Sequence, residues 1–64
     1  DAHIDDPLCQ LNLQTSDFSW VTKELMLIAE GCCNGRLVST LEGGYDLKAL
    51  AECVGAHVSV LMEL

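Results

Sequence analysis

The sequence predicts an α/β fold in which one strand lies between two helices, and three stretches support that prediction. Apolar residues recur with the 3.6-residue period of an amphipathic helix in two stretches, one before and one after Gly35. Between them, the run "RLVSTL" contains β-branched residues and is flanked by glycines, which is typical of a strand. The order helix, strand, helix is the repeating unit of an α/β protein with a parallel sheet.

The acidic segment "DAHIDDPL" precedes these elements and is predicted to be a loop. It places Asp1, His3, Asp5 and Asp6 within six residues, so it could be either a metal site or a solvated acidic turn. Taken alone, such a cluster favours the solvated loop. We expect Asp6, which precedes Pro7, to have a structural role in which it accepts hydrogen bonds from loop N–H groups.

The first helix is predicted to begin at Thr15 or Ser16, because either hydroxyl can accept a hydrogen bond from a free backbone N–H group. Its apolar residues fall on one side and are expected to be buried: Phe18, Val21, Leu25, Ile28 and Ala29. The helix is predicted to end at the glycines and asparagine of "GCCNG".

The strand is predicted between Gly35 and the Gly43–Gly44 pair, and its apolar content suggests that it is buried. Asp46 is a candidate N-cap for the second helix, which is expected to run to the C-terminus. The apolar positions of that helix again follow the helical period: Leu47, Leu50, Ala51, Val54, Val58 and Leu61. His57 is expected to be half-buried on this helix rather than catalytic.

A lone strand leaves both of its edges unpaired, and a βαβ unit needs a strand before the first helix that this sequence does not contain. The 64 residues also make at most one small domain with a limited core. The chain begins with Asp1 rather than Met. We therefore expect residues 1–64 to be an incomplete domain, part of a larger sheet.

Composition argues against several function classes. Ten acidic and three basic residues give a net charge of −7, which disfavours direct binding to a nucleic-acid backbone. No stretch approaches the roughly 20 apolar residues of a membrane span. The four cysteines form no CxxC pair and are expected to be reduced and structural, and no secretory signal is visible. A cytoplasmic location is the default expectation.

Ligands of open α/β sheets bind beyond the carboxyl ends of the strands. "EGGYD" follows the predicted strand, and "DAHIDDPL" lies at the same rim if a strand precedes it. Together with "WVTKELM" and "GRLVSTLEGGYDLKALAECV", these segments resemble, in order and spacing, the C-terminal part of the catalytic domain of zinc-dependent histone deacetylases. The resemblance covers essentially the whole chain and is strongest to the bacterial and class II-like members.

The resemblance implies a three-layer α/β/α sandwich of the arginase/deacetylase type, with a mainly parallel sheet. It implies that Asp1 is a Zn²⁺ ligand and that Tyr45 stabilises the tetrahedral oxyanion formed as an acetyl-lysine or acetylated amine is hydrolysed. By the same resemblance, Leu8, Gly43 and Gly44 border the substrate. His3 is not expected to bind the metal, because the D-x-H ligand pair of the family lies on an earlier strand.

A single carboxylate will not hold catalytic zinc, so the isolated chain is expected to be inactive. The other interpretation is a free-standing, non-enzymatic interaction module. In that case the two amphipathic helices and the unpaired strand would be buried by association with a second copy, which makes a homo-oligomer.

Overall fold

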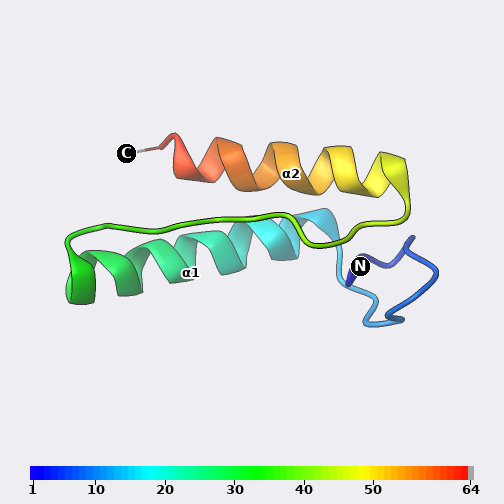
Figure 1. Ribbon diagram of the computed structural model, residues 1–64, viewed down its shortest axis with the longest axis horizontal. Helices are drawn as coiled ribbons and strands as arrows, with labels where there is room; N and C mark the ends of the chain where they lie inside the picture. The colour runs from blue at the N-terminus through cyan, green and yellow to red at the C-terminus, as the bar shows by residue number, and fades with distance from the viewer. Residues whose placement is uncertain (64) are drawn as a thin grey trace.

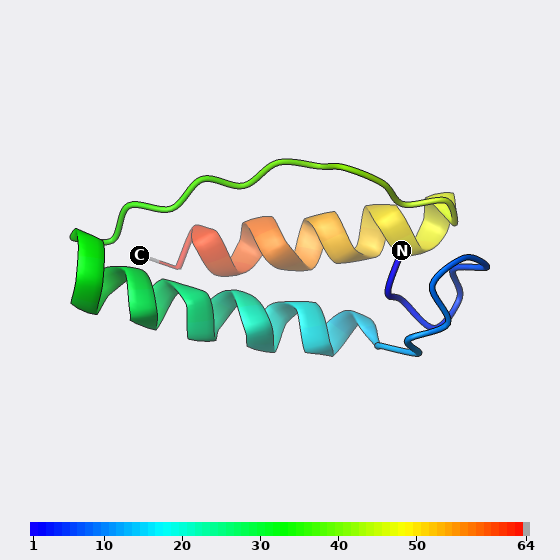
Figure 2. The same cartoon turned by 60° about the horizontal axis from the view of Figure 1, so that its bottom comes forward.

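The computed structural model describes residues 1–63, which form two helices joined by an extended segment. Helix α1 spans Thr15–Cys33 and helix α2 spans Leu47–Leu61. Figures 1 and 2 show the helices side by side and running in the same direction, while residues 36–46 return alongside them. Both helices therefore run opposite to the extended segment, which is the direction expected for the helices of an α/β unit.

The N-terminus of α1 differs from the prediction. Gln14 is the N-cap, and its backbone N–H donates to the Asp17 carboxylate at 2.8 Å. The prediction that Thr15 or Ser16 caps this helix is wrong, because Thr15 is already helical. Its hydroxyl instead contacts His3 Nε2 at 3.1 Å and Glu52 at 3.4 Å.

The N-terminus of α2 follows the prediction, since the Asp46 carboxylate accepts a hydrogen bond from the backbone N–H of Ala49 at 2.8 Å. The two helices end differently. Asn34, in the left-handed conformation with φ of 57°, forms the C-cap of α1, as its place in "GCCNG" suggested. Helix α2 ends at Leu61, so it does not continue through residues 62 and 63 as predicted, and residue 64 lies outside the described residues. Neither helix is long and apolar enough to cross a membrane.

The predicted strand is extended but has no partner. Within residues 1–63, no backbone-to-backbone hydrogen bond involves residues 37–44, and the sole β pairing is an isolated parallel bridge between His3 and Leu13. Val38 is 95% exposed, so the prediction that this segment is buried is wrong for the part of the chain described here. The physical reason is that no strand within residues 1–63 pairs with this segment or covers it.

The core is small for a chain in which half the residues are hydrophobic. Within residues 1–63, the buried apolar residues are Ala29, Ala49 and Val60. Three members of the predicted buried stripe of α1 are instead exposed: Val21, Leu25 and Ile28. The other two members follow the prediction, since Ala29 is buried and Phe18 is half-buried. The buried face of α1 thus includes Thr22 with Ala29, and it leaves Val21, Leu25 and Ile28 facing outward.

Candidate functional site

The acidic loop and the glycine turn meet at one end of the molecule, where both helices begin (Figure 1). The loop is closed by two backbone bonds, from Leu13 N–H to Ala2 at 2.9 Å and from Ile4 N–H to Leu13 at 2.6 Å. These bonds bring Asp1 to the end of the extended segment. The sequence-based expectation that "DAHIDDPL" and "EGGYD" share a rim therefore agrees with the arrangement of the backbone.

Asp1 and Gly43 are in direct contact. The Asp1 carboxylate lies so close to Gly43 that a Cβ on that glycine would be 2.6 Å from Oδ1. Gly44 has φ of 122°, and a Cβ there would lie 2.7 Å from Cδ1 of Leu50. A side chain at Gly43 would require the Asp1 carboxylate to move, whereas a side chain at Gly44 is disfavoured by the backbone conformation itself and would also displace Leu50.

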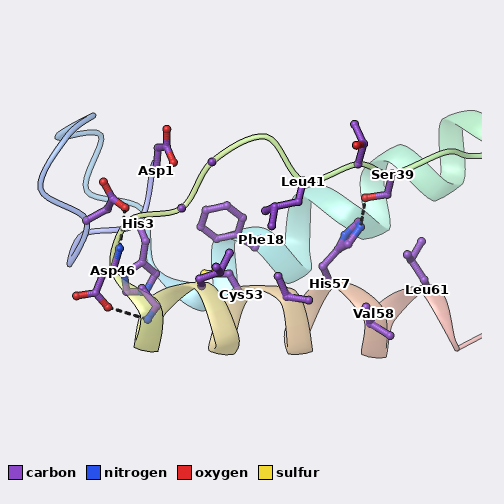
Figure 3. A pocket seen from close by; sticks show the side chains of 17 residues that line it. Asp1, His3, Phe18, Ser39, Leu41, Asp46, Cys53, His57, Val58 and Leu61 are labelled. Carbon is purple, nitrogen blue, oxygen red and sulfur yellow. Dashed lines mark hydrogen bonds between the residues drawn. The ribbon is translucent and has the colours of Figure 1, made fainter.

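A cavity of about 400 Å³ opens between the extended segment and the two helices (Figure 3). Asp1, Gly43 and Gly44 line its end at the rim, and Phe18, Leu41 and Leu50 are among its apolar walls. Figure 3 shows the rings of Phe18 and His57 and the side chain of Leu41 between the extended segment and α2.

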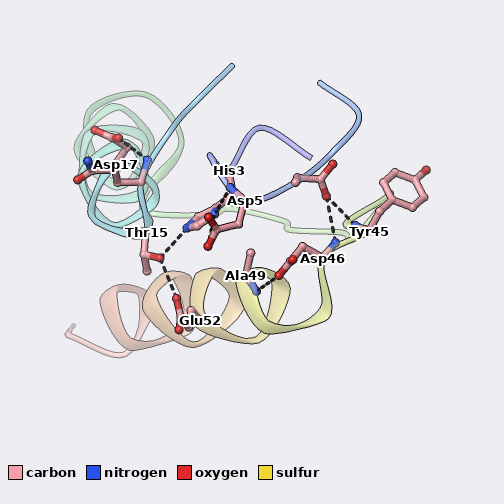
Figure 4. Close-up of polar contacts among 10 residues, drawn as sticks. His3, Asp5, Thr15, Asp17, Tyr45, Asp46, Ala49 and Glu52 are labelled. Atoms are coloured by element: carbon pink, nitrogen blue, oxygen red, sulfur yellow. Dashed lines mark hydrogen bonds and ion pairs between the residues drawn. The ribbon is translucent and has the colours of Figure 1, made fainter. Parts of the chain in front are cut away.

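Tyr45 and Leu8 are close to this rim but do not line the cavity. Tyr45 is 57% exposed, and Figure 4 shows its ring directed away from the acidic loop. Its backbone N–H is nevertheless fixed by a 2.8 Å hydrogen bond to Asp6 Oδ2. Leu8 is also exposed, on the outer side of the loop. The structure therefore brings Asp1, Gly43 and Gly44 into contact with the cavity, and leaves the side chains of Tyr45 and Leu8 outside it.

Asp6 is a buried carboxylate at the rim. It accepts hydrogen bonds from residues much more distant in the sequence than its position in the loop predicted. One oxygen accepts the N–H of Leu8 at 3.0 Å, as expected for a loop carboxylate. The other accepts the N–H groups of Tyr45 and Asp46, which lie far along the chain. These bonds, that of Leu8 first, hold the pKa of the Asp6 carboxyl below its ordinary value, although burial opposes them.

His3 is buried, and both of its ring nitrogens have partners. Nδ1 accepts the backbone N–H of Asp5 at 3.1 Å, and Nε2 contacts the Thr15 hydroxyl at 3.1 Å (Figure 4). The ring also stacks on Phe18. Both ring nitrogens are thus engaged within the loop and with α1, and the expectation that His3 does not bind the metal stays a prediction.

His57 joins three segments of the chain. Its Nδ1 lies 2.9 Å from the hydroxyl of Thr22 on α1, and its Nε2 lies 2.8 Å from the hydroxyl of Ser39 on the extended segment. It is half-buried, as predicted. Its contacts hold the extended segment against the helices rather than presenting a free nitrogen to the cavity.

All four cysteines are free thiols. Cys53 lines the cavity, and burial raises the pKa of its thiol. A protonated thiol is a poor nucleophile, so Cys53 is better explained as a wall of the cavity than as a reactive group.

The residues present do not make a zinc site on their own. Within residues 1–63, no three His, Cys, Asp or Glu side chains are grouped so that they could hold a metal ion. Asp1 is suited to be one oxygen ligand, but a catalytic zinc needs about three protein ligands. The further ligands would have to come from outside the described residues.

Comparison with known proteins identifies relatives along almost the whole chain. The model of the histone deacetylase domain family matches residues 1–61 of this chain. The chain is 46% identical over 63 residues to type-2 histone deacetylase 1 of Dictyostelium discoideum, an alignment that covers 98% of this chain and 4% of that protein.

Two further relatives come from a plant and an archaeon. Histone deacetylase 14, chloroplastic, of Arabidopsis thaliana is 37% identical over 62 residues, covering 97% of this chain and 15% of its own length. A probable deacetylase of Archaeoglobus fulgidus is 38% identical over 48 residues, covering 75% of this chain and 13% of its own. No solved structure matches. The chain thus spans a small part of the length of the curated relatives that it matches.

Proposed function

Because the chain belongs to the histone deacetylase family, whose domain has the α/β fold of the arginase/deacetylase type, we propose that residues 1–64 are the C-terminal part of a deacetylase catalytic domain. The proposed reaction is zinc-dependent hydrolysis of the amide bond of an acetyl-lysine or a related acetylated amine. The observation that supports this most directly is the contact between Asp1 and Gly43, which brings the acidic loop and the Tyr45 turn to one rim.

The small core supports the proposal that the domain is incomplete. The extended segment has two open edges, and the apolar stripe of Val21, Leu25 and Ile28 faces outward. In a complete α/β/α sandwich, neighbouring strands would pair with these edges and further elements would cover exposed apolar side chains.

In the complete domain Asp1 would be one ligand of Zn²⁺, which acidifies a water molecule and polarises the amide carbonyl. Tyr45 would donate its hydroxyl proton in a hydrogen bond to the carbonyl oxygen, where negative charge grows as the tetrahedral state forms. Such a donor stabilises the transition state more than the substrate. The exposed position of the Tyr45 ring leaves it free to meet a substrate that enters from the rim.

Gly43 and Gly44 would let the backbone pass close to the acyl-lysine chain, and Leu8 would contribute an apolar contact at the channel mouth. The exposure of Leu8 at the rim is compatible with this role. Nothing in these contacts selects one acetylated substrate over another, so the proposal extends to acetylated lysines and acetylated amines as a class.

The test is an assay of the zinc-loaded, full-length protein on an acetyl-lysine peptide. Tyr45→Phe should lower kcat by about 100-fold to 1,000-fold, the loss expected for one oxyanion donor, while protein stability stays the same. Asp1→Ala should abolish zinc retention and activity together. A Tyr45→Phe enzyme that keeps the wild-type kcat would contradict the role of Tyr45.

A second candidate function is a non-enzymatic module that self-associates, and the exposed apolar stripe with the two open strand edges favours it. The two candidates differ on Tyr45: a module should tolerate Tyr45→Phe without consequence, whereas in the full-length enzyme that change should remove most of the activity. The purified 64-residue chain tests a separate point, whether these residues suffice for turnover. We expect it to be inactive on acetylated peptides and to associate or rearrange, because one strand cannot form a sheet. Hydrolysis of acetylated peptides by this chain alone would overturn the proposal that zinc ligands from outside these residues are required.

A further inference from the structure

The Asp6 carboxylate lies at the junction of the acidic loop, the glycine turn and the first turn of α2, since it contacts Leu8, Tyr45 and Asp46. It is 6% exposed and all of its hydrogen-bond partners are backbone N–H groups. Oδ1 accepts Leu8 N–H at 3.0 Å, while Oδ2 accepts Tyr45 N–H at 2.8 Å and Asp46 N–H at 3.2 Å. One side chain therefore ties the loop that follows Asp1 to the turn that carries Tyr45.

Few contacts other than the bond to Asp6 fix the position of Tyr45. Its ring is 57% exposed, and within residues 1–63 its hydroxyl makes no hydrogen bond. Its neighbours are constrained, since Gly44 is in a conformation that suits glycine and Asp46 caps α2. The hydrogen bond from Tyr45 N–H to Asp6 connects this short constrained turn to the acidic loop. Within residues 1–63, Asp6 is therefore the hydrogen-bonded link between the backbone of Tyr45 and the acidic loop.

The electrostatic environment at the N-terminus of α2 favours a negatively charged side chain at the position of Asp6. Asp46 is the N-cap of α2, and its N–H and that of Tyr45 precede the first helical turn. The positive end of the helix dipole stabilises a negative charge there. Charge-assisted bonds to backbone N–H groups are also stronger than bonds between neutral groups.

We propose that Asp6 is a positioning residue for the deacetylase reaction: it fixes the backbone of Tyr45 relative to the Asp1 loop, so that the phenol hydroxyl reaches the carbonyl oxygen of the substrate. This inference rests on the function proposed above. It goes beyond the sequence-based expectation, in which Asp6 merely ordered its own loop.

Asp1 is anchored separately from Asp6. The backbone bonds between Leu13 and the Ala2–Ile4 segment hold the first residues of the loop, and none of them involves the Asp6 side chain. Replacement of Asp6 should therefore disturb Tyr45 more than the zinc ligand. This separation gives the proposal a readout, because zinc content and turnover should respond differently.

The experiment is a double-mutant cycle in the zinc-loaded, full-length protein, with Asp6→Asn and Tyr45→Phe made singly and together. Asparagine keeps one acceptor oxygen but places an NH₂ group opposite a backbone N–H. We expect Asp6→Asn to lower kcat by about 10-fold to 100-fold, because small misplacements of a catalytic group are that costly. KM and bound zinc should stay near the wild-type values.

In the Tyr45→Phe background, the same Asp6→Asn change should cost less than about 3-fold, because groups that act as a unit are not additive. A merely structural role would lower activity by the same factor in both backgrounds. Asp5→Asn is the matched control, since Asp5 is a neighbouring acidic residue with an exposed side chain, and it should leave kcat unchanged.

The outcomes separate the two proposals. If the wild-type protein has no deacetylase activity, or if Tyr45→Phe has no effect, the proposed function fails and the role of Asp6 fails with it. If Tyr45→Phe lowers kcat but Asp6→Asn is neutral or strictly additive, only the positioning role is overturned. Should Asp6→Asn not fold, Asp6→Glu, which keeps both oxygens on a longer side chain, takes its place in the same cycle with the same criteria.

Discussion

The carboxylate of Asp1 lies directly against the backbone of Gly43, so close that a Cβ on Gly43 would be 2.6 Å from Oδ1 and 2.9 Å from Oδ2. The two residues come from opposite parts of the chain, one from the acidic loop and one from the end of the extended segment. Their contact makes Gly43 a determinant of where a zinc-ligating carboxylate could sit.

Replacement of this glycine tests the contact. Gly43→Ala should push the Asp1 carboxylate away, and we expect zinc affinity of the full-length protein to fall by about 10-fold to 100-fold, as for other changes that misorient a ligand. The zinc content after dialysis against a competing chelator measures this. Gly31→Ala is the control, because a Cβ at Gly31 has no neighbour within 4 Å, and equal zinc loss in both variants would refute the explanation.

Gly44 should be sensitive for a different reason. Its φ of 122° is strained for a residue with a side chain, and Cδ1 of Leu50 would lie 2.7 Å from the new Cβ. We expect Gly44→Ala to lower the free energy of unfolding by about 1–3 kcal/mol, as measured by urea denaturation. Gly55→Ala, in the middle of α2 with open space around it, should instead stabilise the protein by about 0.4–1 kcal/mol.

The contacts of His57 predict which ring nitrogen carries the proton. The Thr22 hydroxyl donates to the carbonyl of Phe18 at 2.6 Å, so it is left to accept from Nδ1–H of His57. In the neutral ring Nε2 then accepts from the Ser39 hydroxyl. Imidazole ¹⁵N NMR shifts should show the Nδ1–H tautomer, and a dominant Nε2–H tautomer would contradict this assignment.

The hydrogen bonds of His57 also predict that replacement of Ser39 lowers the stability of the protein more than replacement of Ser59. Ser39→Ala removes the hydroxyl that meets His57 and should lower the free energy of unfolding by about 0.5–1.5 kcal/mol. Ser59→Ala, at an exposed position on α2, should change it by less than about 0.5 kcal/mol. Thermal denaturation of the two variants compares them directly, and an equal loss would mean that the Ser39 contact adds nothing.

Asp6 should make the stability depend on acid. Its pKa is lower in the folded protein than the ordinary value, so the unfolded chain binds more protons between the two pKa values. The stabilisation is therefore complete above the unfolded pKa of about 4 and is lost as pH falls through the folded value. Asp6→Asn should flatten the decline in stability below pH of about 4. Urea midpoints across this range, with Asp5→Asn alongside, would show it.

Helix ends that depend only on residues close together in the sequence were predicted correctly. Asp46 caps α2 through a bond to Ala49, three residues away, and Asn34 ends α1 in the left-handed conformation, as short-range rules require. Thr15 breaks the same rules, because its hydroxyl is engaged by His3 and Glu52. Side-chain partners that are distant in sequence are invisible to a rule for helix caps.

The long-range features were harder to predict for the same reason. The helical period of α1 identified an apolar stripe, yet Val21 and Ile28 are exposed here while Thr22 is buried against α2. Periodicity shows which residues share a face, but not which face the neighbouring elements cover. The rule that ligands bind beyond the carboxyl ends of the strands placed the Asp1 and Tyr45 segments on one rim, whereas only the structure revealed the hydrogen bond between Asp6 and the backbone of Tyr45.

The bonds from Asp6 to Tyr45 and Asp46 join residues separated by 39 and 40 positions. Contacts of such large separation form late, because the intervening chain must be ordered first. During synthesis the acidic loop leaves the ribosome well before the tyrosine turn, so the Asp6 carboxylate stays hydrated until residues 45 and 46 emerge. We expect the acidic loop and the tyrosine turn to be joined only after residues 45 and 46 have left the ribosome, so this end of the molecule forms later than either helix.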